Sequence, residues 1–167
     1  VLNSSFNAYS DFSLITYFKS FGDVDSRIFC ANDACEECDY NFADFWIGIT
    51  DNQISIQWGE WGSQQFWYGE PCQDDQWHSV AVSLENNETI RVFLDGVLVG
   101  EENDVQINFD NLELYSFGQD WDPGPTTSDF FIGDLDNISI WNIALTENEV
   151  EQYLNCVNGN ENGLVGY

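Results

Sequence analysis

The chain has 167 residues, 43% of them hydrophobic and 16% aromatic, which is enough to bury the core of one ordinary domain and excludes a disordered chain. Thirty acidic residues stand against three basic ones, and the formal net charge of -27 excludes nucleic acids and anionic membrane surfaces as natural partners, because both would be repelled. No apolar run approaches the roughly 20 residues that cross a bilayer, so we expect no membrane insertion.

Short runs of β-branched and aromatic residues, separated by Asn, Asp and Gly, recur along the chain and predict the strands of a sandwich or barrel. In chain order, the predicted strands cover residues 12–18, 45–50, 53–58, 77–84, 89–100, 129–133 and 137–141. Asp95 and Gly96 make a tight turn inside 89–100, so residues 77–100 form two successive hairpins. A last short strand is expected at 164–167.

One helix is predicted near the C-terminus. Thr146 opens the segment TENEVEQYLN, and Glu149 follows three residues later, which is the spacing of a capping box. Val150, Tyr153 and Leu154 supply the side of the helix that faces inward. We expect residues 1–167 to form a single domain, excised from a longer secreted protein.

The cysteines and the absence of methionine indicate an oxidising, extracellular compartment. Four of the five could form two disulfide bonds, which would clip the segments CANDACEEC and YGEPC together near one rim; the five are Cys30, Cys35, Cys38, Cys72 and Cys156. A zinc site of four cysteines that recruits Cys30 and Cys72 is the alternative. It is less favoured, because the only histidine, His78, lies far along the chain in a predicted strand.

The segments WHSVAVSLENNETIRVFLDGVLVG and FFIGDLDNISIWNIALTENEV together resemble the laminin-G-like jelly roll, the group that includes pentraxins and the concanavalin A-like lectins and glucanases. In that group a strand that opens with W-H leads to a D-G turn, and a later G-x-L-D-x-I-x-I-W strand leads into a short helix. The resemblance implies an all-β fold, a two-sheet antiparallel β-sandwich with one short helix near the C-terminus. It also implies that Trp77 and Trp141 lie in the core.

The segment FGQDWDPGPTTSDFFIGD is similar to the stretch of pentraxins in which a G-Q strand end runs into a calcium-binding acidic loop. The resemblance implies calcium as a cofactor, with Asp120, Asp122 and Asp129 as ligands and Gln119 assisting. An earlier loop would add ligands from Asp39, Asn41 and Asp44. The chemistry agrees, because calcium takes six to eight oxygen ligands and clustered carboxylates repel each other unless a cation lies among them.

The segment WGEWGSQQFWYGEP gathers large aromatic rings with little aliphatic company. Exposed rings flanked by amides and carboxylates suit sugars, whose C–H faces stack on the ring while their hydroxyls bond to the polar groups. The candidate ligand-binding residues are Trp58, Trp61, Trp67, Tyr68 and, between two predicted calcium ligands, Trp121. The alternative is that some of these rings only close the sandwich.

Catalysis is not expected. The glucanases of this fold carry two glutamates in an E-x-D-x-(x)-E arrangement. Here Glu102 and Asp104 begin that pattern, but Gln106 and Ile107 follow where the second glutamate would fall. The sequence therefore predicts a non-catalytic extracellular module that binds calcium and a cell-surface glycan or polysaccharide. An adhesion or spacer module that contacts protein partners or neighbouring domains, with purely structural calcium, is the alternative.

Overall fold

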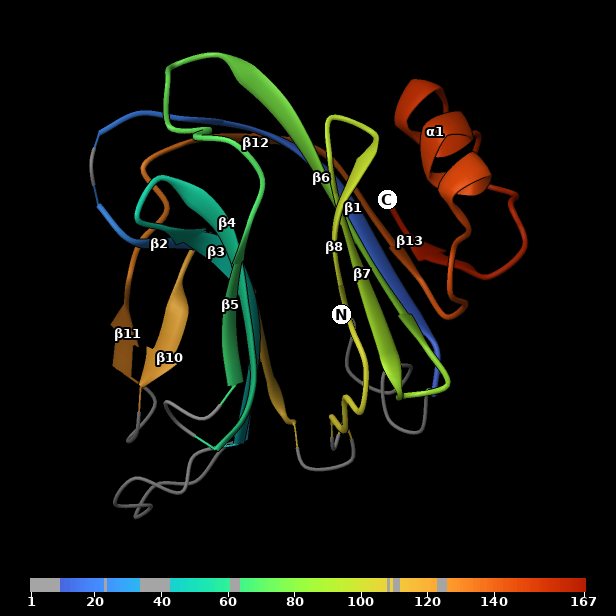
Figure 1. The fold of residues 1–167 in the computed structure, drawn as a ribbon, viewed down its shortest axis with the longest axis horizontal. Coiled ribbons are helices and arrows are strands. Elements are labelled where there is room, and N and C mark those ends of the chain that lie inside the picture. Colours follow the sequence, from blue (N-terminus) through green and yellow to red (C-terminus); the bar gives the residue numbers. More distant parts are fainter. Residues whose placement is uncertain are drawn as a thin grey trace.

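The computed structural model describes residues 10–22, 24–33, 43–60, 64–107, 109, 112–122 and 126–167. Two antiparallel sheets pack face to face, and one helix lies near the C-terminus, so the predicted all-β jelly-roll sandwich is confirmed (Figure 1). The six-stranded sheet has the order β13 (Leu164–Gly166), β12 (Gly133–Trp141), β1 (Phe12–Ser20), β6 (Trp77–Glu85), β7 (Thr89–Leu94) and β8 (Val97–Glu102).

The second sheet has five strands, in the order β5 (Gln64–Tyr68), β4 (Gln53–Glu60), β3 (Ala43–Thr50), β2 (Ser26–Asn32) and β9 (Leu114–Phe117). A separate small hairpin consists of β10 (Asp120–Asp122) and β11 (Thr126–Ser128). Figure 1 shows this hairpin beside the five-stranded sheet, on the side that faces away from the six-stranded sheet. The outer side of the five-stranded sheet is therefore flanked by an acidic hairpin.

The core lies between the two sheets and follows from the alternation of side chains along each strand. On β3, Phe45, Ile47 and Ile49 point inward and are fully buried. On the facing sheet, Val80 and Val82 of β6 do the same, and the same core includes Leu14, Phe18, Ile54, Ile56, Leu84, Ile90 and Val92. The sequence encodes this layer as strict alternation, which fixes which residues of each strand are left on the outer face.

The helix α1 (Glu147–Asn155) covers one end of the outer face of the six-stranded sheet. Its capping box is confirmed, since the Thr146 side chain accepts from the Glu149 backbone and the Glu149 carboxylate accepts from the Thr146 N–H. The Tyr153 ring stacks on Trp141 with their centroids 4.4 Å apart. The described residues include no helix with the length and apolarity needed to cross a membrane.

The predicted strands are confirmed with one exception. Residues 129–132 form a loop, and a single strand, β12, runs from Gly133 through the predicted 137–141 segment. The core position predicted for Trp77 is wrong, because its side chain is 50% exposed whereas Trp141 is fully buried. Trp77 pairs with Lys19 at one end of β1, whereas Trp141 pairs with Ser13 near the other end, where α1 packs.

Candidate functional site

The described side chains on the outer face of β3, β4 and β5 are polar or aromatic, and none of them is charged. The register sets Trp46 opposite Gln57, and Gln57 opposite Gln65, in a row that runs across the three strands. The described side chains on this face that alternate with the core residues are Trp46, Thr50, Gln53, Ser55, Gln57, Gln65 and Trp67. None of these seven is acidic, although the chain carries 30 acidic residues. Four of the seven are buried, which disfavours charged groups at those positions: Trp46, Thr50, Ser55 and Gln57.

Several of these polar side chains are buried even though they point away from the core. Gln57 is 5% exposed and Ser55 is fully buried, and the Ser55 hydroxyl donates to Thr50 Oγ1 at 3.0 Å. Trp67 differs, because its side chain is 45% exposed at the edge strand β5. The accessible part of the outer face is therefore the Trp67 indole with the partly exposed amides of Gln53 and Gln65, a combination that suits ligands with both apolar faces and hydroxyls.

Arg27 occupies the centre of the outer face next to this row. Its guanidinium carbon lies 3.8 Å from the centre of the Trp46 ring, a cation–π contact. Its Nε atom is 3.3 Å from Asp120 Oδ2, and its Nη2 atom is 2.8 Å from Asp129 Oδ2. Gly48 makes room for this side chain, because a Cβ there would lie 3.2 Å from the Arg27 Cδ atom and 2.3 Å from the Ser26 carbonyl oxygen.

The hairpin carboxylates converge on Arg27. Asp120 Oδ1 accepts from the Cys30 thiol at 2.8 Å and from the Trp121 backbone N–H at 2.7 Å. The backbone carbonyl of Asp129 accepts from the Arg27 N–H at 3.0 Å. Burial raises the pKa of the Asp129 carboxyl, the nearby Arg27 lowers it, and the carboxylates of Asp120, Asp122 and Asp25 raise it further. The carboxyl groups therefore outnumber the one cation among them.

These positions bear on the predicted calcium ligands. Asp120, Asp122 and Asp129 do lie close together, and the Gln119 backbone carbonyl accepts from the Ser116 hydroxyl at 2.9 Å. In the described part of the chain, however, no three His, Cys, Asp or Glu side chains converge closely enough to hold a metal ion. Carboxylates are ligands of the type that calcium binds, but two of these, Asp120 and Asp129, form ion pairs with Arg27. Asp39 and Asn41 lie outside the described residues, and Asp44 is described only in its backbone pairing with Asn32 and Gly59.

The predicted aromatic ligand residues divide between the two faces. Trp67 and Gln65 lie on the outer face, whereas Trp58 and Tyr68 lie on the inner face at 5% and 7% exposure. The ring of Phe66 stacks between them. Trp121 on β10 is half-buried, and Trp61 lies outside the described residues. Sequence reasoning missed Trp46, Gln57 and Ser55, although the alternation in QISIQW assigns the amide and hydroxyl residues to one face.

The expected pairing of cysteines does not occur among those that the structure describes. Cys30 is buried on the outer face, where its thiol donates to Asp120, whereas Cys72 packs into the core between the sheets. A disulfide bond or zinc site that uses both is therefore wrong, because the sheet separates them. Cys156 is exposed after α1 and forms no disulfide in the described structure. Cys35 and Cys38 lie outside the described residues.

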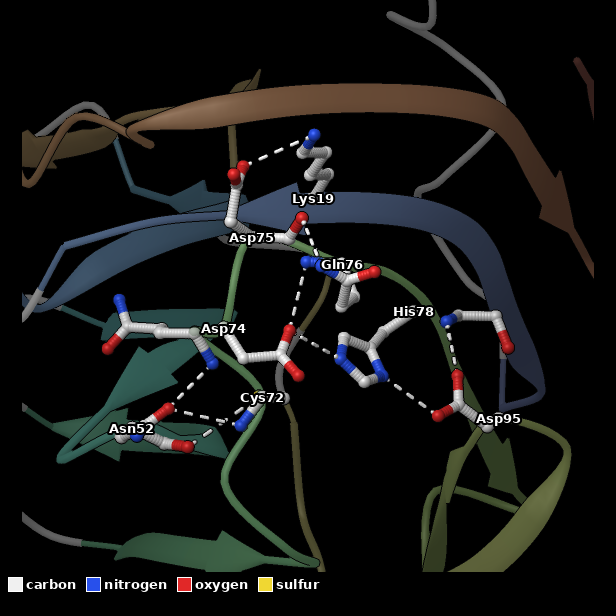
Figure 2. A network of polar contacts seen from close by, with 10 residues as sticks. Lys19, Asn52, Cys72, Asp74, Asp75, Gln76, His78 and Asp95 are labelled. Atoms are coloured by element: carbon white, nitrogen blue, oxygen red, sulfur yellow. Dashed lines mark hydrogen bonds and ion pairs between the residues drawn. The ribbon is translucent and has the colours of Figure 1, made fainter.

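His78 lies in the polar network shown in Figure 2, which also includes Asn52 in the turn between β3 and β4. Its Nδ1 atom is 2.8 Å from Asp95 Oδ2 and its Nε2 atom is 3.1 Å from Asp74 Oδ1. Burial lowers the pKa of His78, but the hydrogen bonds to Asp95 and Asp74 outweigh it, and the net pKa is raised. An imidazolium that donates from both nitrogens ties the loop before β6 to the β7–β8 turn and holds no free nitrogen for base catalysis.

The family model of the concanavalin A-like lectin/glucanases superfamily matches residues 2–151. The chain belongs to this superfamily. No curated protein matches the chain. Membership agrees with the two-sheet sandwich, and it leaves both lectin-type binding and glucanase-type catalysis open as functions.

Solved structures of this superfamily's fold resemble the chain at low identity. The CBM40 module of a Ruminococcus gnavus sialidase has a TM-score of 0.73 at 11% identity, covering 86% of this chain and 82% of that one. The NanB sialidase of Streptococcus pneumoniae has a TM-score of 0.70 at 15% identity, covering 87% of this chain and 24% of that one. A heptameric pentraxin from Limulus polyphemus has a TM-score of 0.67 at 17% identity, covering 95% and 76%. These similarities confirm the jelly-roll fold.

Proposed function

We propose that this chain is a non-catalytic glycan-binding module and that the glycan lies on the outer face of β3, β4 and β5. The observation that carries the proposal is the composition of that face: indole, amide and hydroxyl groups, with no acidic group among its seven described side chains. Sugar rings offer C–H faces to an indole and hydroxyls to amides, so the accessible groups of the face, Trp67, Gln53 and Gln65, each have a counterpart in the ligand.

One structural relative, solved in two complexes, supports the class of ligand. The Ruminococcus gnavus CBM40 module has been solved with α2,3- and α2,6-sialyllactose bound. The net charge of -27 of this chain opposes free anionic glycans at long range. The proposed ligands are therefore neutral glycans, or acidic ones bridged by calcium, on a cell surface or in an extracellular polysaccharide.

Calcium is a separate proposal for the cluster of Asp120, Asp122 and Asp129. Its support is the raised pKa of Asp129, which burial and three neighbouring carboxylates produce and which a divalent cation would reverse. Asp122 and Asp129 would hold the ion, with Gln119 assisting and with Asp39, Asn41 and Asp44 supplying oxygens from the earlier loop. Arg27 would keep its contact with Asp120. A bound ion would fix the hairpin against the edge of the outer face.

A second candidate function is contact with protein partners or neighbouring domains in the extracellular space. The observation that favours it is a group of exposed apolar side chains near the end of β1, brought together by the bond from Phe21 N–H to the Ile132 carbonyl at 3.4 Å. Phe21 and Ile132 are 47% and 41% exposed, and Phe130 nearby in sequence is 57% exposed. Such side chains suit a protein surface better than a sugar.

An array of immobilised neutral and acidic glycans, probed with the whole chain in chelator and in calcium, tests the proposed function. The proposal predicts binding to a defined subset of glycans. Binding to none of them under either condition, together with retention of the folded state, would contradict it and leave the protein-contact function as the better account.

A further inference from the structure

The two sheets form a second concave site where their edge strands β5 and β8 meet. Tyr68 lies against Gly100, where an added Cβ would lie 2.1 Å from the ring, and the Tyr68 hydroxyl is 3.1 Å from Glu102 Oε1. Burial and Glu102 raise the pKa of Tyr68, so this hydroxyl stays protonated and donates. The sandwich edge is closed at this point, and Figure 1 shows β5 and β8 at the facing edges of the two sheets.

Further along β5 the edge opens into a cleft of about 450 Å³. Aromatic and amide residues line it: Trp58, Gly59, Gln64, Phe66, Asn103, Asp104 and Gln106. On the aromatic side three rings are stacked. The ring centroids of Trp58 and Phe66 lie 5.1 Å apart with an interplanar angle of 13°, and the centroid of Tyr68 lies 6.4 Å from that of Phe66. The volume lies within the range of small-molecule sites, roughly 300–1,000 Å³.

The polar side of the cleft is held rigidly by the β6–β7 turn. Val105 and Ile107 are buried, whereas Asp104 and Gln106 of the same loop are exposed. The Val105 N–H donates to the Glu88 carbonyl at 2.9 Å, and the Ile107 N–H donates to Asn87 Oδ1 at 2.9 Å. These contacts fix the loop before any ligand arrives, which lowers the entropy lost on binding.

The available groups define the ligand. Asn103 Oδ1 accepts from the Thr89 hydroxyl at 3.0 Å, so its Nδ2 donors remain for a ligand, while Gln64 and Gln106 offer both donors and acceptors. Asp104 adds an acceptor, and no lysine or arginine lines the cleft. Hydroxyl groups, which donate and accept, match this set, whereas a carboxylate or phosphate would be repelled by Asp104 with no cationic side chain in the lining to offset the repulsion.

We propose that the cleft between β5 and the loop after β8 is a second ligand site, distinct from the outer face, that takes an uncharged pyranose ring with its C–H groups against the part of the Phe66 side chain that lines the cleft and its hydroxyls on Gln64, Asn103 and Gln106. The segment WGEWGSQQFWYGEP thus serves two sites, with Trp67 on one face of β5 and Phe66 on the other. This inference shares only its class of ligand with the proposed function, and either can fail alone.

The test uses the ¹⁵N-labelled whole chain and follows the side-chain amide signals of Gln64, Asn103 and Gln106 and the indole signal of Trp58. The probes are the methyl glycosides of glucose, galactose, mannose and N-acetylglucosamine, with methyl glucuronide as the charged counterpart of methyl glucoside. We expect at least one neutral glycoside to shift these signals at millimolar concentration. We expect methyl glucuronide, and the double variant Asn103→Ala/Gln106→Ala, to bind roughly tenfold more weakly or worse.

Gln152→Ala, which removes an exposed amide from α1, is the matched control and should bind as the unmodified chain does. The inference is overturned if no neutral glycoside shifts the cleft signals, if the double variant binds equally well, or if methyl glucuronide binds as tightly as methyl glucoside. The Trp67 indole signal reports the outer face in the same spectra. A shift of the Trp67 signal alone would therefore contradict the ligand site in the cleft and agree with the proposed site on the outer face.

Discussion

The Arg27 guanidinium lies over Trp46, with its carbon atom 3.8 Å from the ring centre, and from there it reaches the carboxylates of Asp120 and Asp129. One cation therefore joins the outer face of the five-stranded sheet to the acidic hairpin. Its side chain is only 11% exposed, so its charge is held largely out of water. The integrity of the candidate site depends on this contact.

Replacing Arg27 with methionine should destabilise the fold by about 3 kcal/mol, because it leaves the poorly exposed Asp120 carboxylate without its partner. Urea unfolding followed by tryptophan fluorescence measures the change. Arg91→Met is the control, since Arg91 pairs with Glu85 and Glu101 at a more exposed position and should cost less than about 1 kcal/mol. Equal losses in the two variants would show that the Arg27 cluster is an ordinary surface network.

Calcium should raise the melting temperature of the chain more than magnesium or sodium chloride at matched ionic strength. Simple screening of a chain with net charge -27 would raise it in all three salts, so the difference between salts is the measurement that matters. Asp122→Asn should remove the calcium-specific part and keep the general salt effect. If the three salts act alike on the unmodified chain, the carboxylates are only a screened surface.

The stability of the fold should fall as the pH rises above about 6.5, the ordinary pKa of a histidine. The folded-state pKa of His78 is raised, so its contribution is complete below the unfolded pKa and is lost as the pH rises through the folded one. The folded-state pKa of Asp74 is lowered, so the contribution of Asp74 to stability is instead lost at acid pH, as the pH falls through its folded-state pKa.

A proton NMR titration of His78 gives its pKa without ambiguity, because it is the only histidine. His78→Gln should flatten the dependence of stability on pH between neutral and mildly alkaline conditions. A His78 pKa at or below 6.5 would mean that the bonds to Asp74 and Asp95 do not hold in solution.

Among the described cysteines, Cys156 should be alkylated in the native protein, and Cys30 and Cys72 only after unfolding. Burial, with help from Asp95 and Asp74, raises the pKa of Cys72 to about 12, so at neutral pH it is an inaccessible thiol. Peptide mapping by mass spectrometry after native and denaturing alkylation measures this. Resistance of Cys30 or Cys72 to alkylation after unfolding without reductant would reveal a disulfide bond.

The layers of the fold could be predicted from alternation, since runs of alternating polar and apolar residues such as QISIQW assign each side chain to one face. The capping box could be predicted as well, because it depends only on Thr146 and Glu149, three residues apart in the sequence. Two features depend on contacts between distant segments and could not be predicted. Arg27 reaches the hairpin carboxylates only because β2 and β10 lie together, and Trp77 is exposed only because α1 covers the opposite end of the sheet.

The division of the aromatic run between two faces has the same origin. Trp67 and Phe66 are neighbours in sequence, and the pleat of β5 sends them to opposite sides of the sheet. The sequence indicated an aromatic surface, but only the register of β4 with β5 shows that Trp67 alone of that run is accessible on the outer face among the described residues.

Binding of a glycan identified on the array to Trp67→Ala and Trp77→Ala, measured by calorimetry, tests the central claim most directly. The two tryptophans are similarly exposed, at 45% and 50%, but they lie on different sheets. Loss of a stacking indole should weaken binding by roughly tenfold or more in Trp67→Ala and leave Trp77→Ala unchanged. Undiminished binding by Trp67→Ala, or a loss confined to Trp77→Ala, would contradict a glycan site on the outer face of the five-stranded sheet.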